Sequence, residues 1–479
     1  MPYQLYIDGQ WRDGERGRTI DIPNPATGEV VATQAYGGAS DTREAVEAAA
    51  RSFIDWKACT AYERANFLNK AALLIRERAA NIARVVTEEN GKPLGEALAE
   101  TRGCAAWFEW YAEEGKRVYG RSVPSNYGHK QHWVWQQPVG VVAAIAPWNF
   151  PINLLCRKLA AALAAGCTVV SRPSSRTPLS SALIFECLHD AGFPPGTVNL
   201  LVGSPSEMTD VLLSHPAVRK LAFTGSTAVG KQLMQQAGER ITRVSLELGG
   251  HAPLLVFPDV DIEQAAEQTV GGKFRNGGQS CIAPTRIYVH QEIFDEFTKR
   301  VVDLTSRLKV GNGLDESVDM GPLFNEAQVK NTEAFIADAV AHGAEILTGG
   351  SRLTGADYDR GWFFAPTVLS NISDEMRLTC DEVFGPILPL IPFSTEEEAI
   401  HKANNTEYGL AAYVLVRDIS TALRVTEALE YGIIGLNDTV PTVPQAPFGG
   451  WKESGLGREG GIEGIQAYLE TKYISVGLS

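Results

Sequence analysis

The chain has 479 residues, of which 44% are hydrophobic and 21% charged, a composition typical of globular proteins and a length sufficient for two or three domains. Its 57 acidic residues outnumber its 43 basic residues and give a formal net charge of −14, which argues against nucleic acid or an anionic membrane as the main partner. A small anionic substrate is still compatible with this charge, because local arginines can dominate a pocket.

The seven cysteines are scattered without a CxxC pair, so neither a disulfide framework nor a zinc ribbon is expected. The eight histidines lack the spacing of metal ligands, and we predict no metal site. Residues 1–9 have neither the basic nor the apolar region of a secretion signal, and the longest small-apolar stretch, Leu159–Val170, is too short to span a bilayer. We therefore expect a cytoplasmic enzyme without a membrane partner.

The first half of the sequence begins with helices and continues as alternating strands and helices. Residues 41–117 have a helical pattern, with Asp41 as the expected N-cap. Strands are then predicted at residues 140–145, 168–170, 198–202 and 221–223, with helices starting near residues 152 and 178. This alternation predicts a parallel sheet covered by helices on both faces.

A second alternation follows, with strands predicted at residues 254–257, 286–289 and 411–416 and helices starting near residues 261 and 291. We therefore predict two doubly wound α/β domains: a Rossmann-like dinucleotide-binding domain of residues 1–120 and 140–247, and a catalytic domain of residues 248–440. Residues 130–135 alternate like an exposed β-ribbon, and residues 473–476 read as a C-terminal strand. We expect residues 121–139 and 460–479 to form a β-extension that pairs subunits into a homodimer or homotetramer.

Cys281 is the candidate nucleophile. It ends a segment rich in Gly, Asn and Gln, where backbone N–H groups can surround a reacting carbonyl. Glu247 lies 34 residues upstream in an apolar run, where burial raises the pKa of a carboxylate toward neutrality. Inert burial would be favoured for the cysteine alone, but its loop and Glu247 together predict thiol catalysis followed by base-assisted attack of water.

Asn149 follows a predicted strand, at the end of the sheet where open α/β folds bind ligands. Its amide can donate to an oxyanion, although a capping role in a Pro-bracketed turn is equally compatible. Arg172 and Arg176 follow the next strand, and no acidic residue is near them to bind a ribose 2′-hydroxyl. This pattern predicts tolerance of a 2′-phosphate, with a solvated basic turn as the alternative.

The segment Gly225–Lys231 also follows a strand and opens a helix whose N–H groups suit a diphosphate. Gln232 replaces the Ser or Thr of a P-loop, which disfavours a nucleotide hydrolase, the alternative from another class of protein. A thiol esterase would use Cys281 without a dinucleotide, against the paired α/β pattern. A catalytically inactive binding protein would be expected to have lost Cys281 or Glu247.

Five motifs resemble the aldehyde dehydrogenase superfamily in order and spacing over essentially the whole chain: Phe223–Gly230, Leu246–Gly250, the Cys281 loop, Glu382–Pro386 and Pro447–Gly450. Within that superfamily the chain is most similar to succinate-semialdehyde dehydrogenases, because of Arg157, Arg275 and the segment Ser454–Gly460. The resemblance implies oxidation of an aldehyde through a cysteine thioester. A CoA-acylating relative would not need Glu247, so a free acid is the expected product.

The resemblance also implies a role for each matching residue. Cys281 would be the nucleophile and Glu247 the base that activates water, while Asn149 and the Cys281 N–H would form the oxyanion hole with support from Lys158. The residues expected to bind NADP or NAD are Trp148, Arg172, Ser175, Arg176, Gly225, Ser226, Gly230, Leu248, Glu382 and Phe384. Those expected to bind the substrate are Arg157, Arg275, Thr442 and Phe448.

Three departures from the family pattern bear on specificity. Arg172 replaces the usual Lys, and Ser175 replaces the Glu of many NAD-preferring members, so NADP⁺ is expected to be accepted. Ala283 occupies the position where some relatives carry the cysteine of a regulatory disulfide, which is therefore expected to be absent. Thr442 replaces the usual Ser of succinate-semialdehyde dehydrogenases. The arginines still predict an anionic tail, with succinate semialdehyde as the first candidate and sulfolactaldehyde or glutarate semialdehyde as alternatives.

Overall fold

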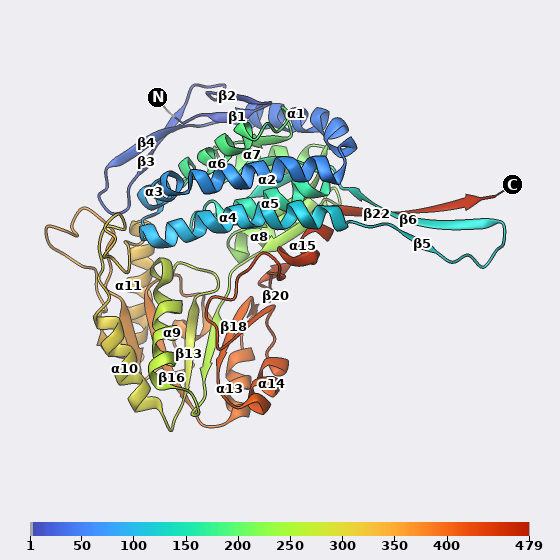
Figure 1. The fold of residues 1–479 in the computed structure, drawn as a ribbon. Helices are drawn as coiled ribbons and strands as arrows, with labels where there is room; N and C mark the ends of the chain where they lie inside the picture. The colour runs from blue at the N-terminus through green and yellow to red at the C-terminus, as the bar shows by residue number, and fades with distance from the viewer. Residues whose placement is uncertain (1–2, 479) are drawn as a thin grey trace.

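The computed structural model describes residues 3–478, so Met1, Pro2 and Ser479, which fall in the predicted ranges 1–120 and 460–479, lie outside the described residues. Two α/β halves are stacked one above the other, and a long β-ribbon projects from the upper half (Figure 1). Among residues 3–478, no helix combines the length and apolar character needed to cross a bilayer. The mixed α/β class with parallel sheets agrees with the fold class expected from the sequence.

The upper half contains an eight-stranded sheet whose five central strands are parallel. Strand β7 is buried along its whole length, as its run of Val, Ala and Ile predicts. The strands, in spatial order, are β2 (Gln10–Arg12), β1 (Leu5–Ile7), β9 (Val198–Leu200), β8 (Thr168–Arg172), β7 (Val141–Ile145), β10 (Val218–Thr224), β11 (Arg243–Glu247) and β21 (Gly455–Leu456).

Helices cover both faces of this sheet. Side chains of β7 alternate between two cores: Val142 and Ala144 face one, while Val141, Ala143 and Ile145 face the other. The helices of this half, with one 3-10 turn, are α1 (Ala39–Ala58), α2 (Ala61–Glu77), α3 (Ala79–Asn90), α4 (Leu94–Glu114), η1 (Gly115–Arg117), α5 (Asn153–Ala165), α6 (Leu179–Asp190), α7 (Pro205–Ser214), α8 (Thr227–Gly238) and α15 (Gly461–Gln466).

The lower half is built on a seven-stranded sheet, again with helices on both faces. Its strands are β14 (Glu345–Thr348), β15 (Thr367–Ser370), β16 (Ile387–Phe393), β13 (Pro284–His290), β12 (Ala252–Val256), β18 (Ala411–Leu415) and β19 (Ile433–Leu436). Its helices are α9 (Ile262–Phe274), η2 (Arg275–Gly278), α10 (Phe294–Ser306), α11 (Glu326–Ala341), α12 (Arg377–Cys380), α13 (Glu396–Asn404) and α14 (Ile419–Ala428).

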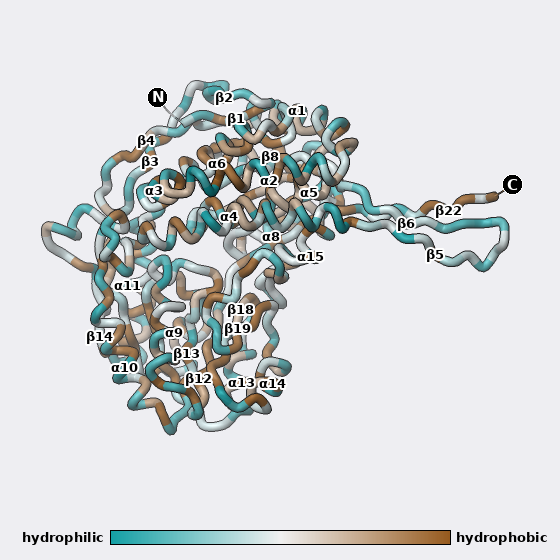
Figure 2. Tube along the Cα trace, viewed as in Figure 1, coloured by the Kyte–Doolittle hydropathy of each residue, from teal (hydrophilic) through white to brown (hydrophobic). Residues whose placement is uncertain are grey.

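Three smaller sheets complete the fold. The projecting ribbon consists of β5 (Arg121–Val123), β6 (Lys130–Pro138) and β22 (Leu469–Gly477), and β22 pairs with β6 along nine residues of the same chain. The end of β22 is hydrophobic in Figure 2. The two other sheets pair β3 (Thr19–Pro23) with β4 (Val30–Ala35) and β17 (Tyr408–Gly409) with β20 (Trp451–Lys452).

The predicted domain limits at residues 120, 140, 247 and 440, and the pairing of subunits through residues 121–139 and 460–479, stay predictions. Helix α15 falls within the range expected to be a β-extension but packs on α4 and α5. The sequence pattern also left β14–β16 and α11–α14 unassigned, because short elements separated by Gly- and Pro-containing loops show little periodicity.

The two large sheets meet at opposite ends of their strands. The parallel strands β7, β8, β10 and β11 end together, as the register pairs Ile145 with Arg172 and Thr224 with Glu247 show. Five residues after Glu247 the chain enters β12, whose neighbour β13 begins three residues after Cys281. The carboxyl ends of the first sheet therefore face the loops that precede the second sheet, and this junction is where ligands of α/β proteins bind.

Candidate active site

The junction brings Cys281 and Glu247 together. The Cys281 Sγ lies 3.9 Å from Glu247 Oε1, although the two residues are 34 positions apart. Burial raises the pKa of the Cys281 thiol well above its usual range, and the nearby carboxylates of Glu247 and Glu382 raise it further. A buried thiol of this kind is protonated at rest and needs an adjacent base, and Glu247 is within reach to act as one.

Glu247 is the last of four buried side chains that are joined by hydrogen bonds and an ion pair. Thr224 Oγ1 donates to Glu247 Oε2 at 2.8 Å and accepts from Lys158 Nζ at 2.5 Å. Lys158 Nζ also pairs with Glu459 Oε1 at 2.6 Å. Burial raises the pKa of Glu247, against the opposing effect of Arg157, and the negative charge of Glu459 raises it further. Burial and the neighbouring carboxylate therefore make Glu247 a stronger base than an exposed glutamate.

Glu459 was not among the residues expected from the sequence. Its backbone pairs with Phe448, donating to the Phe448 carbonyl at 2.8 Å and accepting from the Phe448 N–H at 2.6 Å, which carries its side chain inward. Burial alone would raise the pKa of Glu459, but Lys158 and Arg157 together lower it. A single Glu in a Gly-rich segment normally predicts a solvated turn, so only its order within the motif Ser454–Gly460 could have drawn attention to it.

Asn149 and the Cys281 loop are also adjacent. Asn149 is buried, and its Nδ2 donates to the Gln279 carbonyl at 3.2 Å. The backbone N–H of Cys281 faces its own sulfur, where it opposes the rise in the pKa of the thiol. Asn149 and Cys281 therefore line the same cavity, and their amide donors are candidates to stabilise a developing oxyanion there.

Cys281 forms part of the wall between two cavities. One, of about 300 Å³, is lined by six residues expected to bind the coenzyme: Trp148, Gly225, Ser226, Leu248, Glu382 and Phe384. The other, of about 150 Å³, is lined by all four residues expected to bind the substrate: Arg157, Arg275, Thr442 and Phe448. Cys281 and Leu154 line both cavities, so the thiol is reached from two sides.

The first cavity has features that suit a diphosphate group. Ser226 caps α8 by accepting from the Val229 N–H at 3.5 Å, which leaves a helix N-terminus at the cavity, as a diphosphate requires. A Cβ on Gly230 would collide with the Leu248 side chain, so glycine permits close packing of α8 there. Glu382 Oε1 accepts from the Gly250 N–H at 3.0 Å, and burial raises the pKa of Glu382 to about 7.

The residues expected at the adenosine end lie beyond that cavity. Arg172 ends β8 as a buried residue whose Nε has no hydrogen-bond partner among the described residues, and burial lowers its pKa to about 10. An unpaired buried guanidinium suits an anionic ligand group. Ser175 and Arg176 lie in the turn that follows, and Arg176 is exposed.

The two arginines of the second cavity differ in how their charge is balanced. Arg157 is buried, pairs with Glu459 at 3.4 Å, lies 3.8 Å from Glu247, and has its guanidinium 4.5 Å from the centre of the Phe448 ring. Arg275 has no acidic partner within 4 Å among residues 3–478 and lies 5.4 Å from the centre of the Phe150 ring. Arg275 is therefore the less compensated of the two arginines, although Glu96 interacts with it electrostatically.

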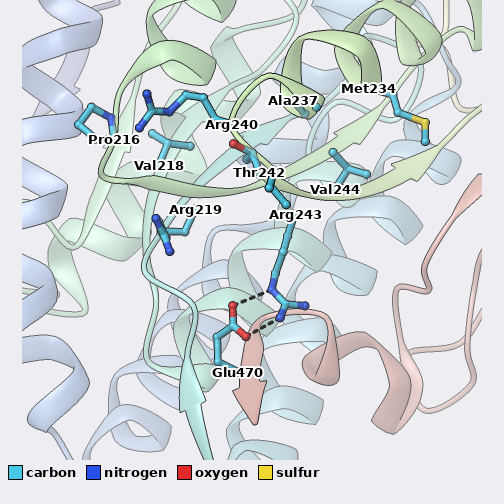
Figure 3. A pocket seen from close by; sticks show the side chains of 12 residues that line it. Pro216, Val218, Arg219, Met234, Ala237, Arg240, Thr242, Arg243, Val244 and Glu470 are labelled. Atoms are coloured by element: carbon cyan, nitrogen blue, oxygen red, sulfur yellow. Dashed lines mark hydrogen bonds and ion pairs between the residues drawn. The ribbon is translucent and has the colours of Figure 1, made fainter. Parts of the chain in front are cut away.

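A cavity of about 650 Å³ lies elsewhere, between α8, β11 and β22 (Figure 3). Figure 3 shows Arg219, Arg240 and Arg243 around it, and Arg243 Nε donates to Glu470 Oε1 at 2.7 Å. It contains neither Cys281 nor Glu247, so its size does not make it the reaction site. Among residues 3–478, no cluster of three or more His, Cys, Asp or Glu side chains is arranged to hold a metal ion.

Comparison with known proteins matches the aldehyde dehydrogenase family over residues 11–474. The chain is 46% identical to the NADP(+) succinate-semialdehyde dehydrogenase GabD of Escherichia coli strain K12 over 99% of this chain and 98% of that protein. It is 45% identical to a glutarate-semialdehyde dehydrogenase of Pseudomonas putida KT2440, over 99% of this chain and 97% of that protein. It is also 45% identical to a 3-sulfolactaldehyde dehydrogenase of Pseudomonas putida, over 100% of this chain and 97% of that protein. The crystal structure of an NADP-dependent enzyme of E. coli superimposes with a TM-score of 0.97 at 45% identity, covering 100% and 98% of the two chains.

Proposed function

The chain belongs to the aldehyde dehydrogenase family, and we propose that it oxidises a small anionic aldehyde, with succinate semialdehyde as the first candidate, to the free acid. The observation that carries this proposal is the second cavity, where the unpaired guanidinium of Arg275 and the partly compensated Arg157 line the same space as Cys281. As a member of the family the protein is an NAD(P)-dependent aldehyde dehydrogenase. The identity of the aldehyde and the roles of the individual residues are our proposals.

In the proposed mechanism Glu247 Oε1, 3.9 Å from the sulfur, takes the proton of the Cys281 thiol. The thiolate adds to the aldehyde carbon, and the oxyanion accepts hydrogen bonds from the Asn149 amide and the Cys281 N–H. When bound, NAD(P)⁺ supplies the hydride acceptor, and the carbonyl forms again as a thioester on Cys281. Glu247 releases the thiol proton to solvent and then accepts a proton from water, the hydroxide adds to the thioester, and cleavage of the C–S bond releases the acid and the Cys281 thiolate.

The buried hydrogen bonds behind Glu247 hold its carboxylate in place. Thr224 donates to Glu247 and accepts from Lys158, and Lys158 is paired with Glu459, so both donors stabilise Glu247 as the ionised base. Lys158 is therefore proposed to support the base rather than to touch the oxyanion, since its Nζ is engaged by Thr224 and Glu459.

For the coenzyme we propose that NADP⁺ is accepted alongside NAD⁺. Arg172 supports this because it is buried and its Nε has no partner among the described residues, while Ser175 and Arg176 place no carboxylate against a 2′-phosphate. The proposal would be wrong if kcat/KM for NADP⁺ were a hundredfold or more below that for NAD⁺.

The tail of the aldehyde is proposed to be a carboxylate or a sulfonate, both of which a guanidinium binds through paired hydrogen bonds. Relatives of nearly equal identity are named for succinate semialdehyde, glutarate semialdehyde and 3-sulfolactaldehyde, so overall similarity does not choose among them. Thr442 lines the cavity beside Arg275 and adds one methyl group relative to Ser, which makes it a candidate for setting the tail length.

The test is a spectrophotometric screen at 340 nm of the three aldehydes and neutral butanal, each with NADP⁺ and NAD⁺, with Cys281→Ala as the inactive control. Arg275→Ala should lower kcat/KM for the anionic aldehydes at least tenfold while changing that for butanal little. Arg275 is chosen because replacing Arg157 would also leave Glu459 without one of its two partners. An equal loss for anionic and neutral aldehydes would refute recognition of the tail.

The nucleotide-hydrolase alternative has no support, since Ser226 caps α8 and lines the cavity that ends at Cys281.

We also propose a homodimer or homotetramer formed through the ribbon, on which Trp135 and Tyr473 are exposed. Light scattering of the purified protein tests this, and a monomer would contradict it. A cytoplasmic location is proposed from the seven free cysteines.

A further inference from the structure

Glu96 lies outside every motif discussed above, yet it contacts the loop that carries Cys281. It occupies the first turn of α4, and its two carboxylate oxygens accept from the Asn276 backbone N–H at 2.9 and 3.2 Å. The two residues are 180 positions apart in the chain. No other acidic side chain among residues 3–478 bonds to this loop between Asn276 and Cys281 apart from Glu247, which contacts the sulfur.

The loop needs an external anchor because a free chain with two glycines would not hold one backbone conformation. Asn276, Gly277 and Gly278 have φ values of 51°, 62° and 72°, three consecutive residues in the left-handed region. Asn tolerates this region better than most residues, but a run of three is not a conformation that a free chain holds. The carboxylate of Glu96 satisfies the N–H at the start of this run.

Asn276 transmits this anchoring to the reaction centre. Its Nδ2 donates to the Asn149 carbonyl at 2.9 Å and to the Gln279 carbonyl at 3.3 Å. Gln279 Nε2 donates back to the Asn276 carbonyl at 2.9 Å. The position of Asn276 therefore fixes both the turn that precedes Cys281 and its distance from the Asn149 loop.

The Asn149 loop has a separate anchor on the same helix. Glu100 accepts from the N–H groups of Ile152 and Asn153 at 3.2 and 3.1 Å and pairs with Lys92 at 2.6 Å. Lys92 Nζ also donates to the Asn149 carbonyl at 2.8 Å. Removal of Glu96 should therefore loosen the Cys281 loop while the Asn149 loop stays in place.

We propose that Glu96 is a positioning residue that holds the left-handed turn of residues 276–278 and so places the Cys281 thiol against the Asn149 amide. The inference rests on the proposed role of Cys281 as nucleophile. A merely structural acid at the start of α4 would affect stability and leave the reactivity of the thiol unchanged, because a negative charge near a helix N-terminus stabilises the helix wherever its oxygens point.

The experiment compares Glu96→Ala, Glu96→Gln and the control Glu109→Ala, which alters an exposed glutamate of the same helix. The second-order rate of iodoacetamide labelling of Cys281, located by peptide mass spectrometry, is measured with the thermal midpoint of each variant. Labelling does not depend on the aldehyde. Turnover is read with butanal, because the charge of Glu96 is felt by Arg275.

Glu96→Ala leaves the Asn276 N–H without its acceptor, and the usual cost of such a loss corresponds to about a 5- to 150-fold effect. We expect the labelling rate and kcat of Glu96→Ala to fall by this factor, with KM for butanal nearly unchanged. Glu96→Gln keeps an oxygen for the N–H and should restore both rates to within about threefold.

The proposal would be overturned if Glu96→Ala kept the wild-type labelling rate and kcat. It would also be overturned if Glu96→Gln lost as much labelling rate and kcat as Glu96→Ala. A lowered thermal midpoint with unchanged labelling would assign Glu96 a structural role only. Failure of the proposed function would show differently: Cys281→Ala would then keep its activity, whatever the Glu96 variants do.

Discussion

Glu459 offers a sharp test of the buried charge network. Its Oε1 lies 2.6 Å from Lys158 Nζ and its Oε2 3.4 Å from the Arg157 guanidinium, so one carboxylate compensates two buried cations. Glu459→Gln keeps the shape and an acceptor oxygen but removes the charge. Arg157 and Lys158 would then share only Glu247.

The expected loss of stability follows from this geometry. Breaking a buried ion pair by removing one partner costs about 3–5 kcal/mol, and the low end applies because the amide oxygen still accepts from Lys158. A loss of about 3 kcal/mol lowers the thermal midpoint of a domain of 150–250 residues by about 6–12 °C. The control Glu109→Gln breaks the exposed pair with Arg76, which should cost less than about 1 kcal/mol.

The pH dependence has a defined sign. Lys158 and Arg157 hold the pKa of Glu459 below its usual range, so its contribution is present above the ordinary glutamate pKa of about 4.3 and is lost as the pH falls through the folded-state pKa. The difference in midpoint between wild type and Glu459→Gln should therefore be full at pH 7 and shrink below about pH 4.

Catalysis should respond in the same variant. The charge of Glu459 helps to raise the pKa of Glu247, so the pKa of Glu247 falls when that charge is removed. The acid limb of the kcat profile, measured from pH 5 to 9, should move to lower pH, and the plateau should fall because the base is weaker. An unchanged midpoint at pH 7, or an acid limb displaced to higher pH, would refute this reasoning.

Three further predictions concern single sites. In Glu247→Gln both the Cys281 thiol and the attacking water lose their base, so stopped-flow absorbance at 340 nm should show no burst of NAD(P)H, and turnover should be about 10²–10⁴-fold slower than wild type; undiminished turnover would remove Glu247 from the mechanism. In Gly250→Ala, the added Cβ would collide with the Cys281 carbonyl oxygen, so we expect a destabilisation of about 1–3 kcal/mol and slower labelling of Cys281, and wild-type labelling would contradict the packing. Lys273 is buried with no partner for Nζ among the described residues, and burial lowers its pKa to about 7. Below pH 7, Lys273 is protonated in the unfolded chain and, increasingly, in the folded chain. Between pH 7 and about 10.4, Lys273 binds the proton only in the unfolded chain, so the free energy of unfolding rises with pH in that window. Lys273→Met should therefore raise the thermal midpoint at pH 7, by the equivalent of about 1–4 kcal/mol, with a gain that shrinks toward pH 10.

The parts of the site that could be predicted from the sequence are those attached to strand ends. Asn149, Arg172, Ser226 and Glu247 each follow or end a run of buried apolar residues, and the carboxyl ends of parallel strands meet at one edge. A local pattern therefore carried enough information to predict that these residues lie at one edge of the sheet. The family motifs added the coenzyme and the order of the chemical steps.

The residues that escaped prediction make their contacts across the chain. Glu459 reaches Lys158 over 301 positions, and Glu96 reaches Asn276 over 180. Both are glutamates in segments whose local pattern, a Gly-rich turn and the polar start of a helix, is typical of solvated charge. Burial of such a residue depends on which partner the fold brings to it, and periodicity does not record that.

Arg157 was predicted from the sequence, but the contacts that compensate its charge were not. Its residue type predicts an anion-binding site, and it does line the cavity beside Cys281, but Glu459 and Glu247 already compensate part of its charge. A guanidinium that is paired and stacked in advance gains less from a new anion than one that is free. The sequence identified the arginines, whereas only the contacts rank Arg275 above Arg157 for recognition of the tail.

The placement of Cys281 between two cavities separates the chemistry from the choice of substrate. Glu247 and the residues expected to bind the coenzyme lie at or near the ends of β7, β8, β10 and β11, where register and close packing leave little freedom. The substrate side includes Val440, Thr442 and Phe448, which belong to loops after β19. A change in those loops can alter the length or charge of the tail without moving Glu247 or the oxyanion donors. Under the proposed mechanism, this division would let loop changes alter the substrate while Cys281 and Glu247 stay in place, and relatives at 45–46% identity are named for three different aldehydes.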